Sequence, residues 1–132
     1  MFDEYNPDVV YRAFNSTENH IKPEPPGYRL GSGLFKSSRG VSVYLGAETT
    51  LRDVVRRHPN WGVASLPLSA LVEFTIERDP EDTPEDLPGH RIFSCTKRGP
   101  ADRLAGLARI EIRVPGFEVV GFGGSVGVDA PA

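Results

Sequence analysis

The chain has 132 residues and a formal net charge of −3, which is the size of one domain and gives no overall attraction to nucleic acid. Its single cysteine excludes an intramolecular disulfide and a multi-cysteine zinc site. No apolar run approaches the roughly 20 residues that span a bilayer, and the first residues lack the basic and apolar regions of a secretory signal. We therefore expect a cytoplasmic protein that does not associate with membranes, with one domain over residues 1–122 and a flexible tail over 123–132.

The N-terminal quarter predicts one strand and one long connection. Residues 9–14 are β-branched and aromatic, which favours a strand, and strict alternation places Arg12 on a face with two apolar residues. Residues 15–33 contain three prolines and no regular period, so we expect an ordered loop with a turn at 25–27. The apolar residues expected to hold this loop are Ile21, Tyr28 and Leu30.

The middle of the chain predicts a strand over 41–45, then a helix capped by Thr49 or Thr50 and ended by Pro59. Residues 61–66 are apolar enough to be buried. Pro67 is placed to open a single helical turn, 67–70. Residues 71–78 alternate between apolar and polar side chains, which predicts a half-exposed antiparallel strand.

The last third begins with residues 79–89, whose five acids and three prolines predict a solvated loop that cannot pack. A strand is expected over 90–95, followed by a helix with Pro100 at its first position. Two further strands, 108–114 and 117–122, are joined by a tight turn.

These elements indicate an α+β fold: a twisted, largely antiparallel sheet of six or seven short strands with two or three short helices. The residues expected to form its core are Phe14, Val43, Val55, Trp61, Val63, Phe74, Ile76, Ile92, Phe93, Leu104, Leu107, Ile112 and Val119.

No strong catalytic motif is present, and the three histidines lack the spacing of metal ligands, so we expect no metal site. The richest polar segment is 29–40, where glycines and donors can cradle a phosphate or a carboxylate, although such a segment also serves as a solvated connector. Its candidate ligand-binding residues are Arg29, Ser32, Lys36, Ser37, Ser38 and Arg39. Arg12 is a further candidate, because a guanidinium in an apolar strand either reaches water or is buried and holds an anion.

Five other residues are candidates for chemistry or for ligand binding. His90 and His20 suit proton transfer near neutral pH, and Glu73 is a carboxylate on the face expected to be exposed. Ser94 shares a strand face with His90 and, with Lys97, is a candidate for binding a ligand in the same cleft. For each, a plain surface position is the alternative. Cys95 is expected to be an ordinary buried cysteine.

A stretch of about forty residues resembles the N-terminal half of RES-domain toxins, which belong to the ADP-ribosyltransferase-like group and consume NAD. The resemblance rests on Tyr11-Arg12 in a first strand, the following glycine-rich loop, and Tyr44-Leu45 before a helix. It implies that Arg12 is the family's arginine and that Asp53 stands where the family has glutamate. The family's later serine would correspond to Ser94 or Ser125.

Three functional hypotheses follow. The first is a non-catalytic interaction domain with a protein partner, in which the acidic loop and the arginines of the first helix are contact surfaces. The second is an NAD-consuming toxin or effector, in which Arg12 and segment 29–40 hold the pyrophosphate and Asp53 or Glu73 faces the ribose. The third is a metal-independent RNase that uses His20 and His90 as acid and base, with RNA as its partner. Under the two enzyme hypotheses the expected ligand is a nucleotide or another small anion, or RNA itself.

Overall fold

The described residues, 2–16 and 20–114 of a computed structural model, form an α+β domain with seven strands, two α-helices and two short 3-10 turns. The expected α+β class is therefore confirmed. Several sequence predictions lie outside the described residues: the turn at 115–116, the strand 117–122 with Val119, and the tail 123–132 with Ser125. Among the described helices, none is long and apolar enough to cross a membrane.

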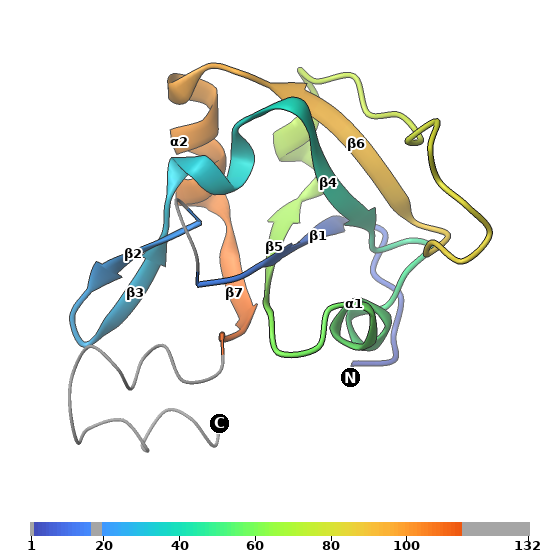
Figure 1. Cartoon of the computed structure of the whole chain (residues 1–132), viewed down its shortest axis with the longest axis horizontal. Helices are drawn as coiled ribbons and strands as arrows, with labels where there is room; N and C mark the ends of the chain where they lie inside the picture. The colour runs from blue at the N-terminus through green and yellow to red at the C-terminus, as the bar shows by residue number, and fades with distance from the viewer. Residues whose placement is uncertain (1, 17–19, 115–132) are drawn as a thin grey trace.

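Five strands form one sheet in the order β6-β4-β1-β5-β7, and every neighbouring pair is antiparallel (Figure 1). The strands are β1 (Val9–Phe14), β4 (Ser37–Leu45), β5 (Gly62–Pro67), β6 (His90–Cys95) and β7 (Arg109–Ile112). Four of the five were expected as strands, whereas the segment that forms β5 was expected only to be buried. Strand β4 starts four residues earlier than predicted because the polar segment before Val41 also pairs with β6.

The connection after β1 is more regular than expected. It contains a hairpin of β2 (Ile21–Glu24) and β3 (Gly27–Leu30), which turns at the cis peptide bond between Pro25 and Pro26. The prediction of a loop without regular structure was wrong there, because strand pairing satisfies the backbone despite the prolines. The expected turn is confirmed, and so is the burial of the three apolar residues predicted to hold this segment: Ile21, Tyr28 and Leu30.

Strands β1 and β4 stay paired over only two positions, Val10 with Leu45 and Tyr11 with Tyr44. The rest of β4 pairs with β6 on its other side, and a bulge shifts the register between Ser37 and Val41. Gly40 lies in that bulge with φ of 118°, a conformation that side chains rarely adopt. Figure 1 shows β4 turning away from β1 beyond the paired positions, which separates the two strands on this side of the sheet.

The two α-helices cover opposite faces of the sheet. Helix α2 (Arg98–Leu107), the hairpin and the turn η1 (Ser32–Phe35) pack on the face that carries Val10 and Phe14. Helix α1 (Leu51–Arg57) packs on the other face, against Tyr11 and Ala13. Because both faces of β1 are buried, the central strand is apolar throughout apart from Arg12.

Helix α1 begins at the predicted cap. The Thr50 hydroxyl accepts from the Asp53 amide at 3.2 Å, and the Asp53 carboxylate accepts from the Thr50 amide at 3.3 Å. This reciprocal pair satisfies two amides that the first turn leaves without helical partners. The helix ends before His58, as the following Pro59 predicts.

Two sequence predictions fail around η2 (Leu68–Leu71) and α2. Residues 71–78 are not a strand: the helical turn extends to Leu71, only Glu77 bridges Ile92, and Val72 is 86% exposed. Of the apolar residues in the alternating pattern after Leu71, Phe74 and Ile76 pack against the core as expected.

Helix α2 begins at Arg98, ahead of Pro100. Its Leu107 is 47% exposed because the core-facing stripe ends with Leu104.

Candidate functional site

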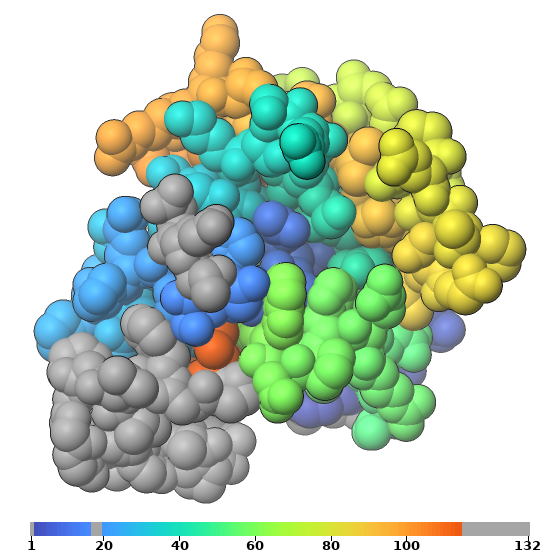
Figure 2. Space-filling model, in the orientation of Figure 1, coloured from blue at the N-terminus to red at the C-terminus, as the bar shows by residue number. Residues whose placement is uncertain are grey.

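A hollow opens on the side of the molecule where β1 and β4 diverge. Figure 2 shows its floor in the deep blue of β1, bordered by the teal of η1 and β4 and by the green of the connection from α1 to β5. Polar side chains from several distant segments meet around this divergence. They are Arg12, Ser42, Tyr44, His58, Asp82 and His90, and together they are called the polar cluster below.

Arg12 bridges the gap between the diverging strands. Its Nε donates to the carbonyl oxygen of Leu34 at 3.0 Å, and an Nη donates to the carbonyl oxygen of Ser42 at 3.2 Å. No carboxylate among the described residues forms an ion pair with this guanidinium. Burial lowers the pKa of Arg12 to about 10, so the group stays charged at neutral pH. The described residues thus give this largely buried positive charge only neutral hydrogen-bond partners.

His90 lies between a carboxylate and a hydroxyl. Its Nδ1 lies 2.7 Å from Oδ1 of Asp82, and its Nε2 lies 3.0 Å from Oγ of Ser42. An ionised carboxylate only accepts, so Nδ1 carries a proton and, in the neutral ring, Nε2 accepts from the Ser42 hydroxyl. The alternative of a plain surface position is wrong for His90, because only 9% of its surface is exposed. Its expected role in proton transfer stays a prediction.

The strand register explains how His90 and Ser42 meet. His90 is directly opposite Tyr44, and Ser42 is two residues further along the same face of β4. Gly89 fixes this start of β6: its amide donates to Oγ1 of Thr49 at 2.9 Å, and its carbonyl accepts from the Leu45 amide at 2.8 Å. A side chain at Gly89 would place its Cβ 2.4 Å from that Thr49 oxygen, so the close approach requires glycine.

Tyr44 connects the two histidines of the cluster. Its hydroxyl lies 2.7 Å from Nε2 of His58, and its ring centroid is 5.3 Å from that of His90. Burial, with the positive charges of Arg57 and Arg12 and the neighbouring His90, lowers the pKa of His58. His58 is therefore neutral at neutral pH, and its Nε2 shares a hydrogen bond with the tyrosine hydroxyl. Its ring also lies 5.1 Å from that of Trp61, which extends the aromatic surface.

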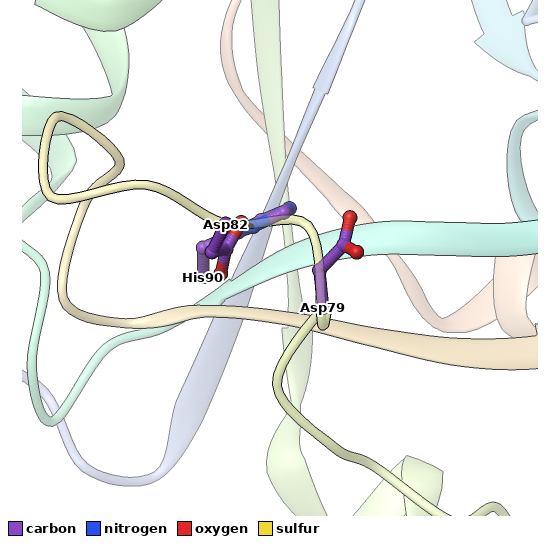
Figure 3. A group of neighbouring side chains, drawn as sticks. All are labelled: Asp79, Asp82 and His90. Carbon is purple, nitrogen blue, oxygen red and sulfur yellow. Dashed lines mark hydrogen bonds and ion pairs between the residues drawn. The ribbon is translucent and has the colours of Figure 1, made fainter.

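The acidic loop, residues 79–89, supplies a carboxylate to the cluster. Figure 3 shows Asp82 lying against His90, with Asp79 from the same loop beside them. The Asp82 side chain is 8% exposed, and its Oδ2 accepts no hydrogen bond from the described residues. The expectation that this loop could not pack was therefore wrong at Asp82. The His90 ring provides the donor that makes burial of one carboxylate tolerable.

The structure separates the residues that the sequence suggested as one phosphate cradle. Arg29 and Ser32 line a cavity of about 630 Å³ between the hairpin and α2, and Arg29 pairs with Glu24 at 3.2 Å. The other members border a second cavity beside Thr96, at the far end of β4: Lys36, Ser37, Ser38 and Arg39. The segment bends through η1 between these places, so its donors do not converge on one ligand.

The remaining candidates are also dispersed. Ser94 and Glu73 line a third cavity, of about 230 Å³, and Glu73 pairs with Arg103 of α2. Lys97 caps α2 as an exposed residue, with its carbonyl accepting from the Cys95 thiol. Ser94 therefore does not share a cleft with His90, although the two share a strand face, because the strand carries them to opposite ends.

Two further candidates have identifiable local roles. Asp53 caps helix α1, as described above, so its carboxylate is engaged there. His20 lies just before β2, where its Nδ1 accepts from the Asn15 amide at 3.4 Å and its carbonyl accepts from the Gly31 amide. Arg12 and His90 are the two candidates that the structure places in the polar cluster, where both bond to Ser42.

Sequence reasoning missed four members of the polar cluster: Ser42, Tyr44, His58 and Asp82. Alternation along 41–45 places Ser42 and Tyr44 on one face, which was a usable signal. No local pattern distinguishes Asp82 from the other acids of its loop, or joins a histidine after α1 to a tyrosine of β4. The chain matches no protein-family model, no curated protein and no solved structure.

Proposed function

We propose that the chain is an NAD-consuming enzyme that binds the NAD pyrophosphate on Arg12 in the hollow between β1 and β4. The single observation that carries the proposal is a largely buried guanidinium with no carboxylate partner among the described residues. Burying a charge is costly unless an opposite charge compensates it, and a planar guanidinium matches the oxygens of a phosphate. A bound anion would supply the missing compensation.

The resemblance to RES-domain toxins supports the choice of NAD. The order of strand, glycine-bearing turn, tyrosine-bearing strand and helix is present as β1, η1, β4 and α1, and β1 and β4 are neighbours. The carboxylates expected at Asp53 and Glu73 are engaged elsewhere. We therefore transfer the carboxylate role to Asp82, which lies in the polar cluster and can stabilise a developing positive charge.

The proposed reaction is hydrolysis of the bond between nicotinamide and ribose. Nicotinamide leaves with the bonding electron pair, and the ribose carbon briefly carries positive charge. Water then attacks that carbon, and its proton passes to a basic nitrogen. His58, which its surroundings keep neutral, is the residue that we assign to this proton.

The test is release of nicotinamide from NAD by the purified chain, followed by chromatography. We expect Arg12→Met to lower the rate at least about tenfold, because a lost charge-assisted contact costs about 1.5–3 kcal/mol. Arg29→Met is the matched control, since Arg29 is exposed on the hairpin and paired with Glu24. If NAD and ADP-ribose neither react nor raise the thermal midpoint of the wild-type chain, the proposal is wrong.

A second candidate is metal-independent cleavage of RNA, and one observation favours it. His58 and His90 both contact Tyr44, with Arg12 beside them, so a base, an acid and a phosphate-binding group are close together. This replaces the expected pairing of His20 with His90. RNA incubated with the chain in EDTA should then yield fragments, and His58→Gln should abolish them. Intact RNA at high protein concentration would eliminate this candidate.

Binding of a protein partner without catalysis stays a prediction. The acidic loop and helix α1 were expected to be separate contact surfaces for such a partner. They instead lie next to each other, with Arg57 and Asp86 3.8 Å apart, so part of each is already engaged by the other. The outward-facing remainder of α1, with Arg56, is what an acidic partner would meet, because Arg52 is paired with Asp3. A chain that is inert toward NAD and RNA but captures a stoichiometric partner would restore this hypothesis.

A further inference from the structure

We propose that Ser42 is an activated nucleophile and that Ser42, His90 and Asp82 form a catalytic relay for acyl transfer from esters that carry a negative charge. This inference goes beyond the use of NAD and requires no nucleotide. It rests on three side chains from β4, β6 and the acidic loop, whose polar atoms form one continuous chain of hydrogen bonds.

The connectivity is that of a nucleophile, a base and an orienting acid. The Ser42 Oγ lies 3.0 Å from Nε2 of His90, and Nδ1 of the same ring lies 2.7 Å from Oδ1 of Asp82. Each distance is within hydrogen-bond range, and the two contacts use different ring nitrogens. A base that is oriented by a third group through its far nitrogen is the arrangement that serine hydrolases reached on several unrelated folds.

The environment of Asp82 suits the orienting role. Its side chain is 8% exposed, and its Oδ2 lacks a hydrogen bond from the described residues, with the Arg78 guanidinium 3.9 Å away. A carboxylate with so little solvation depends on the His90 N–H for stabilisation and gains from any positive charge on that ring. Asp82 therefore favours transfer of the Ser42 proton to His90.

Access to Ser42 comes from the divergence of β1 and β4. Ser42 pairs with Ile92 of β6 on one side, whereas on the other side β1 has already separated from β4. Ser42 is partly exposed, unlike Val41 and Val43. The Ser42 carbonyl accepts from the Arg12 guanidinium, so a fixed positive charge lies beside the nucleophile's own backbone.

Arg12 sets the class of substrate. An ester that carries a carboxylate or phosphate group can bind that group on the guanidinium while its carbonyl carbon faces Ser42. Attack forms a bond from Oγ to that carbon, and the Oγ proton moves to His90. The ester C–O bond then breaks, and His90 returns the proton to the leaving alcohol. Water releases the acyl group from Ser42 by the same steps, which regenerates the free serine.

A metal centre is the competing use of these residues. Asp79, Asp82 and His90 place one ligand atom each within 4.8 Å of one another. Both nitrogens of His90 are already hydrogen-bonded, so a metal would have to break the contact to Asp82 or the contact to Ser42. The relay needs no such rearrangement, and we therefore favour it over cation binding.

The experiment is labelling of the full chain with a fluorophosphonate, which reacts with activated serines, followed by peptide mapping. We expect a single adduct on Ser42 of the wild-type chain. Labelling should be lost in Ser42→Ala and His90→Gln and slowed at least about tenfold in Asp82→Asn. Ser94→Ala is the matched control, because Ser94 lies on β6 outside the relay, and it should label like the wild type.

Two outcomes would overturn the inference: no adduct on wild-type Ser42, or an adduct whose rate is the same in His90→Gln. A thermal midpoint measured for each variant separates lost reactivity from lost folding, and the wild-type adduct needs no variant at all.

Mono-4-nitrophenyl glutarate, an anionic ester, should be hydrolysed faster than neutral 4-nitrophenyl acetate. Arg12→Gln should remove that preference. If Mn²⁺ raises the midpoint and blocks labelling, the metal site replaces the relay.

Discussion

Tyr44 of β4 and His90 of β6 are directly opposite each other, with ring centroids 5.3 Å apart. This register determines the geometry of the polar cluster, because Ser42 follows two residues along the same face. A slip of one residue would turn His90 to the opposite face, among the residues that pack beneath α2. The position of the cluster therefore depends on backbone pairing more than on any contact between the side chains themselves.

The first prediction concerns the energetic cost of Arg12. Arg12→Met should lower the free energy of unfolding by no more than about 1 kcal/mol, because loss of two hydrogen bonds is offset by relief of a buried, uncompensated charge. Chemical denaturation measures this difference. A loss above about 3 kcal/mol would show that the guanidinium is chiefly structural, which would weaken its assignment to ligand binding.

The second prediction concerns pH. The pKa of His58 is lowered in the folded chain from its ordinary 6.5, so protons bind the unfolded chain more readily. Stability should therefore fall as the pH drops through about 6.5, and the loss should level off below the folded pKa. The difference in unfolding free energy between the wild type and His58→Gln, measured from about pH 8 to about pH 5, isolates this contribution. A difference independent of pH would contradict it.

The third prediction compares two leucines of α2. Leu104 is fully buried and Leu107 is 47% exposed, although the sequence predicted both to lie in the core. Leu104→Ala should cost about 2–5 kcal/mol through lost contacts and a residual cavity. Leu107→Ala should change the unfolding free energy by less than about 0.5 kcal/mol. Urea denaturation of both variants gives the comparison, and similar losses would mean that the end of α2 is packed more tightly than the exposure of Leu107 indicates.

The fourth prediction compares two glycines. In Gly89→Ala the new Cβ would lie 2.4 Å from Thr49 Oγ1 and 2.8 Å from the Leu45 carbonyl oxygen, so β6 must shift and the relay should lose alignment. Gly106, in the last turn of α2, has open space where a Cβ would lie, because nothing beyond its chain neighbours and its own helix backbone comes within 4 Å. Gly106→Ala should therefore stabilise the chain by about 0.5–1 kcal/mol. Thermal unfolding of both variants tests the contrast. A neutral Gly89→Ala would show that the start of β6 is not fixed by this contact.

Much of the fold could be predicted from local patterns. The strands around Arg12 and Phe93, and the cap of α1 at Thr50, follow from β-branched runs and from a threonine placed before an acid. The strand predicted over residues 71–78 is absent because alternation of apolar and polar side chains is necessary for a half-buried strand but is not sufficient. That segment bridges β6 only at Glu77, and its neighbour Val72 faces solvent.

The site was harder to predict because its members are distant along the chain. Arg12 was recognisable as a charge among apolar residues, and His90 as a proton-transfer group. Their meeting through Ser42 depends on the divergence of β1 and β4, which no local pattern reveals. Asp82 could not be singled out because the composition of the acidic loop predicts that all of its carboxylates are solvated. The side chain of Asp82 is nevertheless buried.

The hydrogen bond from Arg12 to the Leu34 carbonyl connects the hollow to the face of the sheet on which η1 and α2 pack. Leu34 belongs to η1, and its side chain is buried in the same cluster as Leu104 of α2. An anion that compensates the charge of the guanidinium would hold it on the Leu34 carbonyl and so hold η1 against α2. Slower amide hydrogen exchange in α2 would then report that a ligand occupies a hollow on the far side of β1.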